Sequence, residues 1–161
     1  MNATDEICIM NSDPERKKRA TRLLERASVL FAAEMESTVI EDPETTAPWF
    51  RAQIGFDDTE RFAAVFLDHG RRILSRIIFD EGSRTRCVLY PRKLFQAAFE
   101  CNATGIILSH NHPGGSLQPN PQDRELTKRI LEIGQAMEIT LVDHLIVTRE
   151  GYTSMRRHGW M

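Results

Sequence analysis

The residues best suited to chemistry lie in the stretch LSHNHPGGSLQPNPQDREL, residues 108–126. It places His110 and His112 one residue apart at the end of a predicted strand, so both side chains lie on the same side of an extended backbone. Asp123 follows eleven residues after His112, and the Gly- and Pro-rich loop between them allows the chain to fold back. Two imidazoles and one carboxylate are the ligand set of a catalytic zinc site that keeps one position for water. Zinc lowers the pKa of such a water from about 15.7 toward roughly 7.

The helix that leaves this loop sets the environment of Asp123. Asn120 is a predicted N-cap and Pro121 suits the first helical position, so Asp123 occupies the third position. The partial positive charge of a helix N-terminus keeps a carboxylate there ionised and able to bind a cation. The same spacing also fits a capping box, in which Asp123 would only satisfy a backbone donor. An HxH pair alone is a weak signal, and the strand before it and the helix after it favour the metal site.

A separate amphipathic helix is predicted over residues 14–36. Asp13 can cap it, Pro14 suits its first position, and apolar residues continue at helical spacing to Met35. We expect this helix and its linker to occupy residues 1–42 and the main domain to occupy residues 43–161. The apolar stripe of the helix must pack on the main domain or on a second copy of the chain. The second case would make the protein a homo-oligomer.

The rest of the chain alternates between strand and helix patterns. The nearly continuous apolar run of residues 62–67 is typical of a strand covered on both faces. Strands are predicted at residues 62–67, 73–79, 86–90, 105–109, 140–148 and 152–155, and helices near residues 49–51, 91–102 and 121–138. This order predicts an α/β sandwich with a mixed sheet.

The composition is that of an ordinary globular protein, with 161 residues, 41% hydrophobic, 27% charged and a net charge of −2. This balance does not indicate strong binding to nucleic acid or to an anionic membrane, and basic clusters such as residues 16–19 are typical of solvated faces. The apolar run at residues 62–67 is too short to span a bilayer. Asp5 and Glu6 stand where a signal peptide would be basic and then apolar, and the three cysteines form no CxxC pair. We therefore expect a cytoplasmic location, free thiols and no membrane association.

The HxH pair with its later aspartate, set between a buried strand and a capped helix, resembles the JAMM motif of JAB/MPN metallopeptidase domains. The likeness is closer to the RadC-like branch and covers about residues 43–161. It extends through AVFLDHGRRILSRIIFDEG, VLYPRKLFQAAFECNATGIILSHNHPGG, PQDRELTKRILEIG and VDHLIV. The resemblance implies a cytidine-deaminase-like α/β sandwich whose mixed sheet is mostly antiparallel. Longer members carry an N-terminal helical DNA-binding-like region, so this chain is similar to the short members.

The resemblance also implies roles for individual residues. His110, His112 and Asp123 correspond to the zinc ligands. Glu60, in ERFAAVFL, matches the glutamate before an early strand that takes a proton from the zinc water. A solvated glutamate before an edge strand is the plain alternative for this position. Two less well matched candidates for the same role are Glu81 and Glu100.

Two further positions bear on catalysis. Asn120 stands three residues before Asp123, where the family usually has a serine that steadies the oxyanion. A carboxamide NH₂ can donate to an oxyanion, and asparagine caps a helix as well as serine does. His144, in VDHLIV, lies in a predicted apolar strand, where a histidine is more often a core residue whose hydrogen bonds are satisfied. It or Asp143 could instead support the site from behind the ligands.

Three functions are compatible with these residues. The leading hypothesis is a zinc-dependent hydrolase that cleaves a peptide or isopeptide bond in a protein or peptide substrate with a zinc-activated water. A second is a DNA-repair-associated accessory protein, the traditional description of RadC-like members, whose DNA association would weaken steeply with salt. A third is a catalytically weak MPN scaffold for protein partners, which Asn120 at the serine position favours.

Overall fold

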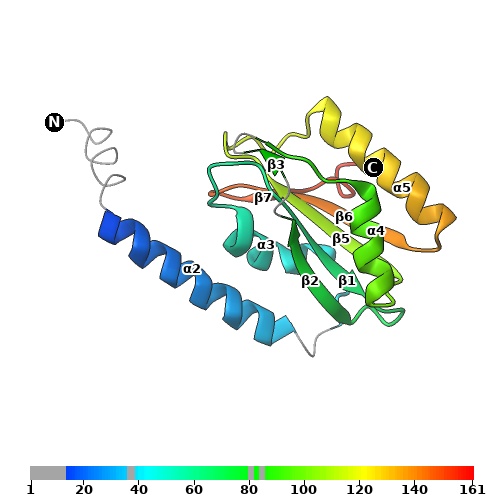
Figure 1. The fold of residues 1–161 in the computed structure, drawn as a ribbon, viewed down its shortest axis with the longest axis horizontal. Coiled ribbons are helices and arrows are strands. Elements are labelled where there is room, and N and C mark those ends of the chain that lie inside the picture. The colour runs from blue at the N-terminus through cyan, green and yellow to red at the C-terminus, as the bar shows by residue number, and fades with distance from the viewer. Residues whose placement is uncertain (1–13, 36–38, 80–81, 84–85) are drawn as a thin grey trace.

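The computed structural model describes residues 14–35, 39–79, 82–83 and 86–161 of the chain. Its elements follow one another as α2 (Pro14–Met35), η1 (Pro43–Thr46), α3 (Ala47–Ile54), β1 (Phe62–Leu67), β2 (Ile73–Phe79), β3 (Gly82–Ser83), β4 (Arg86–Cys87), α4 (Pro91–Glu100), β5 (Gly105–Asn111), α5 (Pro121–Ala136), β6 (Thr140–Val147) and β7 (Tyr152–Ser154). Five strands form one sheet, with α3 on one face and α4 and α5 on the other (Figure 1). Strands β3 and β4 pair with each other separately.

The order of the strands in the sheet is β2-β1-β5-β6-β7. Strand β1 runs antiparallel to β2 and β5, β6 runs antiparallel to β7, and β5 and β6 run parallel. A parallel pair needs a crossover connection, which α5 supplies. One loop therefore joins the C-terminal end of β5 to the N-terminus of α5. This arrangement confirms the predicted α/β sandwich with a mixed, mostly antiparallel sheet.

Strand β5 is central and is buried along its whole length. Ile106 and Leu108 pack in the core with α4 and α5, whereas Ile107 packs in the core with α3. Because side chains alternate along a strand, His110 continues the row that faces α5 and Asn111 continues the row that faces α3. The first candidate ligand is thus directed toward the helix that carries Asp123.

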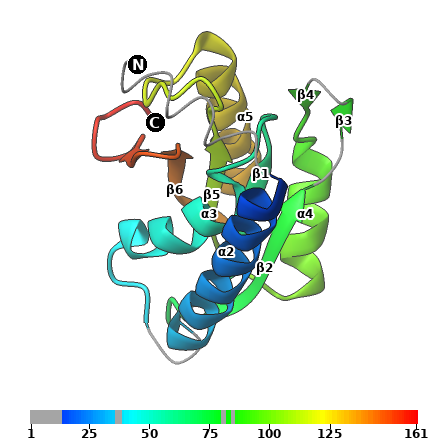
Figure 2. The ribbon, with the colours of Figure 1, turned by 90° about the vertical axis from the view of Figure 1, so that its left-hand side faces the viewer.

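Helix α2 lies beside α3 (Figure 2). The side-chain amide of Gln53 on α3 donates to the hydroxyl of Ser28 on α2. Leu23, Val29 and Leu30 remain more than half exposed. One part of the helix therefore contacts the main domain, but Leu23 and Leu30 of the predicted apolar stripe are not covered by it. A homo-oligomer through this helix stays a prediction. The predicted cap, Asp13, lies outside the described residues.

Two contacts bear on where the main domain begins. Ile40 is only 1% exposed and belongs to the core beside α3. Val39 forms an isolated antiparallel bridge with Arg72. The boundary between residues 42 and 43 stays a prediction, but both contacts tie residues immediately before it to the sheet.

Four strands end at other residues than predicted, and β3 was not predicted. Strands β6 and β7 each end one residue before the predicted end, at Val147 and Ser154. Strand β4 ends at Cys87, not near residue 90, and residues 88–90 form an irregular segment that leads to Pro91, the first residue of α4. Strand β5 continues to Asn111, two residues beyond the predicted end, because the Asn111 backbone N–H donates to the Arg61 carbonyl at 3.2 Å. No helix within the described part of the chain is long and apolar enough to cross a membrane.

Candidate metal centre

The two histidines of the HxH pair sit at the end of β5 on the side that faces α5. His110 is fully buried, and its ring stacks on Phe62 of β1 with 5.2 Å between the ring centroids. His112 follows the strand, is half-buried, and donates its backbone N–H to the Val147 carbonyl at 3.1 Å. The sheet therefore fixes the backbone of both residues before any ligand is considered.

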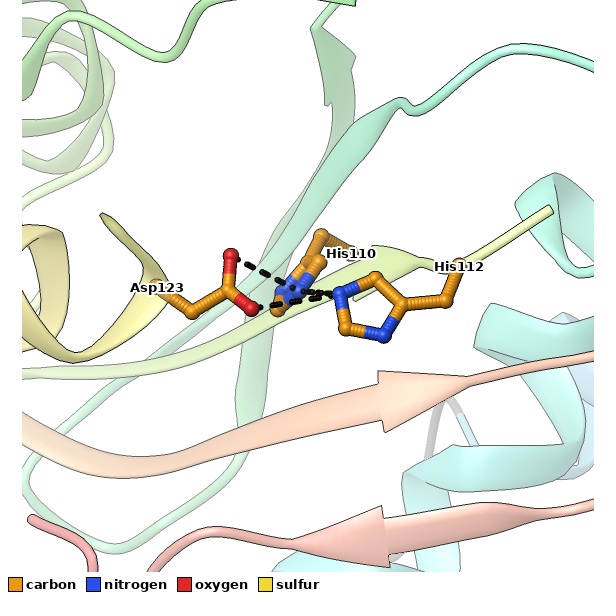
Figure 3. A group of neighbouring side chains, drawn as sticks. All are labelled: His110, His112 and Asp123. Carbon is orange, nitrogen blue, oxygen red and sulfur yellow. Dashed lines mark hydrogen bonds and ion pairs between the residues drawn. The ribbon is translucent and has the colours of Figure 1, made fainter. Parts of the chain in front are cut away.

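Asp123 reaches the histidines from the first turn of α5 (Figure 3). Asn120 is the N-cap, and its side-chain oxygen accepts from the Asp123 backbone N–H at 2.9 Å. In return, Asp123 Oδ2 accepts from the Asn120 backbone N–H at 2.8 Å. This is the capping box that the sequence offered as an alternative to a metal ligand. It holds the carboxylate in place while leaving both of its oxygens directed at the imidazoles.

The three side chains converge on one small volume. Asp123 Oδ1 lies 3.3 Å from His110 Nε2, and Asp123 Oδ2 lies 3.2 Å from His112 Nε2. The two Nε2 atoms are 2.9 Å apart. One ligand atom from each residue lies within 4.8 Å of the others, the spacing of a group that could hold a metal ion.

The electrostatics of the cluster favour a cation. Burial on its own raises the pKa of the Asp123 carboxyl, but the adjacent imidazoles of His110 and His112, together with a hydrogen bond from the Asn120 backbone, bring that pKa well below its usual range. The hydrogen bond with Asp123 raises the pKa of His112, with a smaller contribution from the charge of Glu60. The carboxylate is therefore ionised at neutral pH, and the cluster attracts positive charge.

The proton on the His112 ring can be located from its surroundings. Its Nδ1 lies 2.8 Å from the Ser116 backbone carbonyl, which can only accept, so Nδ1 donates. A neutral His112 ring therefore directs an unprotonated Nε2 at His110 and Asp123. Nitrogen lone pairs and a carboxylate at these distances repel unless a proton or a cation lies among them. The donor set fits zinc, which takes imidazole nitrogen and carboxylate oxygen.

Glu60 lies at the same end of the paired strands β1 and β5 as His112. The antiparallel register of β1 and β5 pairs Phe62 with His110, and Glu60 lies two residues before Phe62. Glu60 is half-buried, and its negative charge contributes to the raised pKa of His112. Of the two other glutamates considered, Glu100 is exposed at the end of α4, where it accepts from the side chain of Gln96, and Glu81 lies outside the described residues.

Asn111, between the two histidines, holds the segment that carries Glu60. Its side-chain oxygen accepts from the Arg61 backbone N–H at 2.6 Å, and its amide group donates to the Thr59 carbonyl at 3.0 Å and to the Asp57 carbonyl at 3.4 Å. Asn111 therefore hydrogen-bonds to the backbone of both neighbours of Glu60, Thr59 and Arg61. The sequence analysis overlooked Asn111, which lies beyond the predicted end of the strand at residue 109. Its position between the two histidines, on the opposite side of an extended backbone, was the available signal.

His144 lies directly behind His110. Its Nε2 is 2.8 Å from His110 Nδ1, and its Nδ1 is 2.6 Å from the Thr127 hydroxyl. Burial, helped by the nearby His110, lowers the pKa of His144 well below its ordinary value, so the ring is neutral. Thr127 was also overlooked by the sequence analysis, although it follows Asp123 by four residues and so shares its helix face.

Asp143 turns away from this cluster. Its carboxylate accepts from the Ser154 hydroxyl at 2.6 Å and from the backbone N–H groups of His144 and Arg156 at 2.7 and 3.2 Å. Burial raises the pKa of Asp143. Asp143 therefore ties β6 to β7 and to Arg156 just beyond it, and its hydrogen bond toward the site is to the backbone of His144.

A mixed sheet flanked by helices, with an HxH pair at the end of a central strand and an aspartate on the crossover helix, is consistent with the JAB/MPN class of domain. Residues 40–160 match the family described as the RadC-like JAB domain, and the chain belongs to this family. It is 40% identical over 121 residues to the UPF0758 protein tlr1707 of Thermosynechococcus vestitus, covering 75% of this chain and 48% of that protein. It is 39% identical over 123 residues to a UPF0758 protein of Finegoldia magna, covering 76% of this chain and 55% of that protein. The chain thus spans about half the length of these curated relatives.

Proposed function

We propose that the protein is a zinc-dependent hydrolase that cleaves a peptide or isopeptide bond, with His110, His112 and Asp123 as the metal ligands. The observation that carries the proposal is the convergence of His110 Nε2, His112 Nε2 and the ionised Asp123 carboxylate within hydrogen-bond distances of one another. Three protein ligands of this kind are typical of catalytic zinc sites, which keep a further position for water. Zinc bound there would supply Lewis acidity and a water of lowered pKa.

Glu60 is the proposed general base. Its carboxylate would accept a proton from the attacking water and later deliver it to the leaving amine, a role that requires a carboxylate beside the ligands. Two observations support this assignment: its charge acts on His112, and Asn111 fixes the backbone on either side of it. A peptide and an isopeptide bond both release an amine, so the same residues serve either substrate.

Asn120 is the proposed oxyanion donor. Its side-chain oxygen is engaged as the helix cap, so only its NH₂ group would be available to donate to a developing oxyanion. Asn120 is exposed, which allows that group to reach a substrate. Capping and oxyanion donation would then use different atoms of one carboxamide.

The test compares wild-type protein with Glu60→Gln on a defined mixture of peptides that includes lysine-ε-linked branches. Both proteins, loaded with zinc, are incubated with the mixture, and new carboxyl termini, which hydrolysis of either kind of bond releases, are identified by mass spectrometry. We expect wild type to produce new termini and Glu60→Gln to produce about 10²- to 10⁴-fold fewer, while both bind one zinc. Equal yields from the two proteins would contradict the proposal.

The two other hypotheses, a DNA-associated accessory protein and a catalytically weak scaffold, stay predictions. Glu60→Gln separates the scaffold from the hydrolase, because a scaffold would behave alike with either residue. Binding to duplex DNA measured across a salt series separates the accessory protein, because phosphate contacts weaken as salt rises.

A further inference from the structure

We infer that His144 and Thr127 are positioning residues that fix the tautomer of His110, so that its Nε2 lone pair, and not an N–H, is directed at the ligand cluster. The inference rests on the proposed function in one respect, namely that a metal uses this lone pair. The basis is a chain of three short contacts that runs from His110 through His144 and Thr127 to the backbone of Asp123.

The Thr127 hydroxyl sets which atom donates in each of these three hydrogen bonds. The Thr127 hydroxyl lies 2.6 Å from the Asp123 backbone carbonyl. A carbonyl only accepts, so the single hydroxyl hydrogen of Thr127 is donated there, as is common for threonine four residues along a helix. The sulfur of Met155, at 3.6 Å, is a longer and weaker acceptor for the same hydrogen. The Thr127 oxygen is left with its lone pairs facing His144.

The next two links follow from the first. His144 Nδ1, 2.6 Å from the Thr127 oxygen, must donate, because that hydroxyl has already used its hydrogen. A neutral imidazole carries one N–H, so His144 Nε2 has none and accepts. His110 Nδ1, 2.8 Å away, is therefore the donor. With its one proton on Nδ1, a neutral His110 directs an unprotonated Nε2 at His112 and Asp123.

The tautomer of the other histidine, His112, is fixed by a different partner. The Ser116 carbonyl accepts from His112 Nδ1 at 2.8 Å and fixes that tautomer directly. His110 is fully buried between Phe62 and the core, so its tautomer is set by a buried partner, and His144 is that partner. Because His144 is also fully buried, its hydrogen bonds are not exchanged with water.

The experiment reads the tautomer in metal-free protein labelled with ¹⁵N in the histidine rings, by long-range ¹H–¹⁵N correlation at mildly alkaline pH. We expect His110 to carry its proton on Nδ1 in wild type. His144→Leu removes the acceptor, so the His110 proton should move toward Nε2. His144→Gln places an amide oxygen at about the reach of Nε2 and should restore the wild-type tautomer. Zinc affinity, measured by competition with a chromophoric chelator, should fall about 10- to 100-fold in His144→Leu and recover in His144→Gln.

A second pair of variants keeps the test valid if His144→Leu does not fold. Thr127→Val keeps the shape of the side chain but leaves His144 Nδ1 without its acceptor, whereas Thr127→Ser keeps the hydroxyl. We expect weaker zinc binding and a mixed His110 tautomer only in Thr127→Val.

Three results would be decisive. An Nε2-protonated His110 in wild type, or a His110 tautomer and zinc affinity unchanged in both His144→Leu and Thr127→Val, would overturn the inference and leave His144 as a packing residue. The inferred tautomers in a wild-type protein that binds no zinc would overturn the proposed function while upholding the positioning role.

Discussion

At the scale of single residues, the candidate centre depends on partners that hold each functional side chain from behind. Asp123 is held by the Asn120 N–H, His112 by the Ser116 carbonyl and His110 by His144. Ligands oriented in this way need little reorganisation to bind a metal, and loss of such supporting contacts typically weakens metal binding. The chemistry therefore depends on more residues than the three that would touch the ion.

Replacement of Asn111 should separate the positioning of Glu60 from metal binding. Asn111→Ala leaves the Arg61 N–H without the Asn111 side-chain acceptor and removes the hydrogen bond to the Thr59 carbonyl. We expect the free energy of unfolding to fall by about 1–3 kcal/mol, measured by urea unfolding of metal-free protein. Zinc stoichiometry should stay at wild type, while hydrolysis in the peptide assay should fall.

The matched control is Asn111→Asp, which keeps the acceptor for Arg61 but directs a carboxylate at two backbone carbonyls. We expect it to be at least as destabilising as Asn111→Ala at neutral pH. Hydrolysis equal to wild type in both folded variants would show that Asn111 does not position Glu60.

At the scale of elements, the crossover helix α5 connects the fold to the site. Its core-facing residues pack against the sheet, with Ile130 fully buried. Its first turn carries the capping box that orients Asp123. A negative side chain at this end of a helix is also stabilised by the helix dipole. The N-cap therefore contributes to both stability and ligand geometry.

Substitution of the cap should reveal this double role. Asn120→Ala removes the acceptor for the Asp123 N–H, and we expect a loss of about 0.5–2 kcal/mol in the free energy of unfolding. Zinc affinity should fall as well, because Asp123 is held less firmly. Asn120→Ser keeps a capping oxygen and should retain both properties. Zinc binding in Asn120→Ala that matches wild type would show that the cap does not orient the ligand.

The strands and helices were largely predictable because their signals are local. The apolar run of β1, the proline that opens α4 and the cap of α5 each lie within one element, and the observed bounds follow them. The spacing of His110, His112 and Asp123 also indicated that these side chains converge, since a strand, a tight loop and a helix N-terminus leave few ways to fold back. The capping box and the metal site were set against each other as alternatives for Asp123, yet in the structure the same carboxylate both completes the capping box and faces His110 and His112.

The supporting residues could not be predicted because their partners are far away in the sequence. Asn111 contacts Thr59 at a separation of 52 residues, and His110 contacts His144 at a separation of 34. These pairs depend on the register of β1 against β5 and of β5 against β6, which no local pattern specifies. His144 was therefore ranked as a core histidine, and Thr127 gave only the weak signal of sharing a helix face with Asp123.

At the scale of the whole molecule, α2 lies to one side of the sheet (Figure 1) and contacts α3. The family match begins at residue 40, and Ile40 is buried in the core beside α3. We therefore expect the core, the sheet and the candidate metal centre to form without α2. The predicted start of the domain at residue 43 would remove Ile40 and the Val39–Arg72 bridge.

Two truncations test this division. A chain of residues 39–161 should fold and bind zinc as the full chain does. A chain of residues 43–161 lacks Ile40, whose burial is typically worth about 1.5–3 kcal/mol, and should be less stable by about that amount in urea unfolding. Failure of residues 39–161 to fold would show that α2 is an integral part of the domain. Equal stability of the two truncations would support a start at residue 43.

The central claim is that His110, His112 and Asp123 together hold one zinc ion, and zinc content after equilibrium dialysis tests it most directly. Elemental analysis should find one zinc per chain in wild type, in Glu60→Gln and in the surface control His69→Ala, and no stoichiometric zinc in His112→Ala or Asp123→Ala. Absence of stoichiometric zinc from folded wild-type protein, or full zinc content in Asp123→Ala, would contradict the claim.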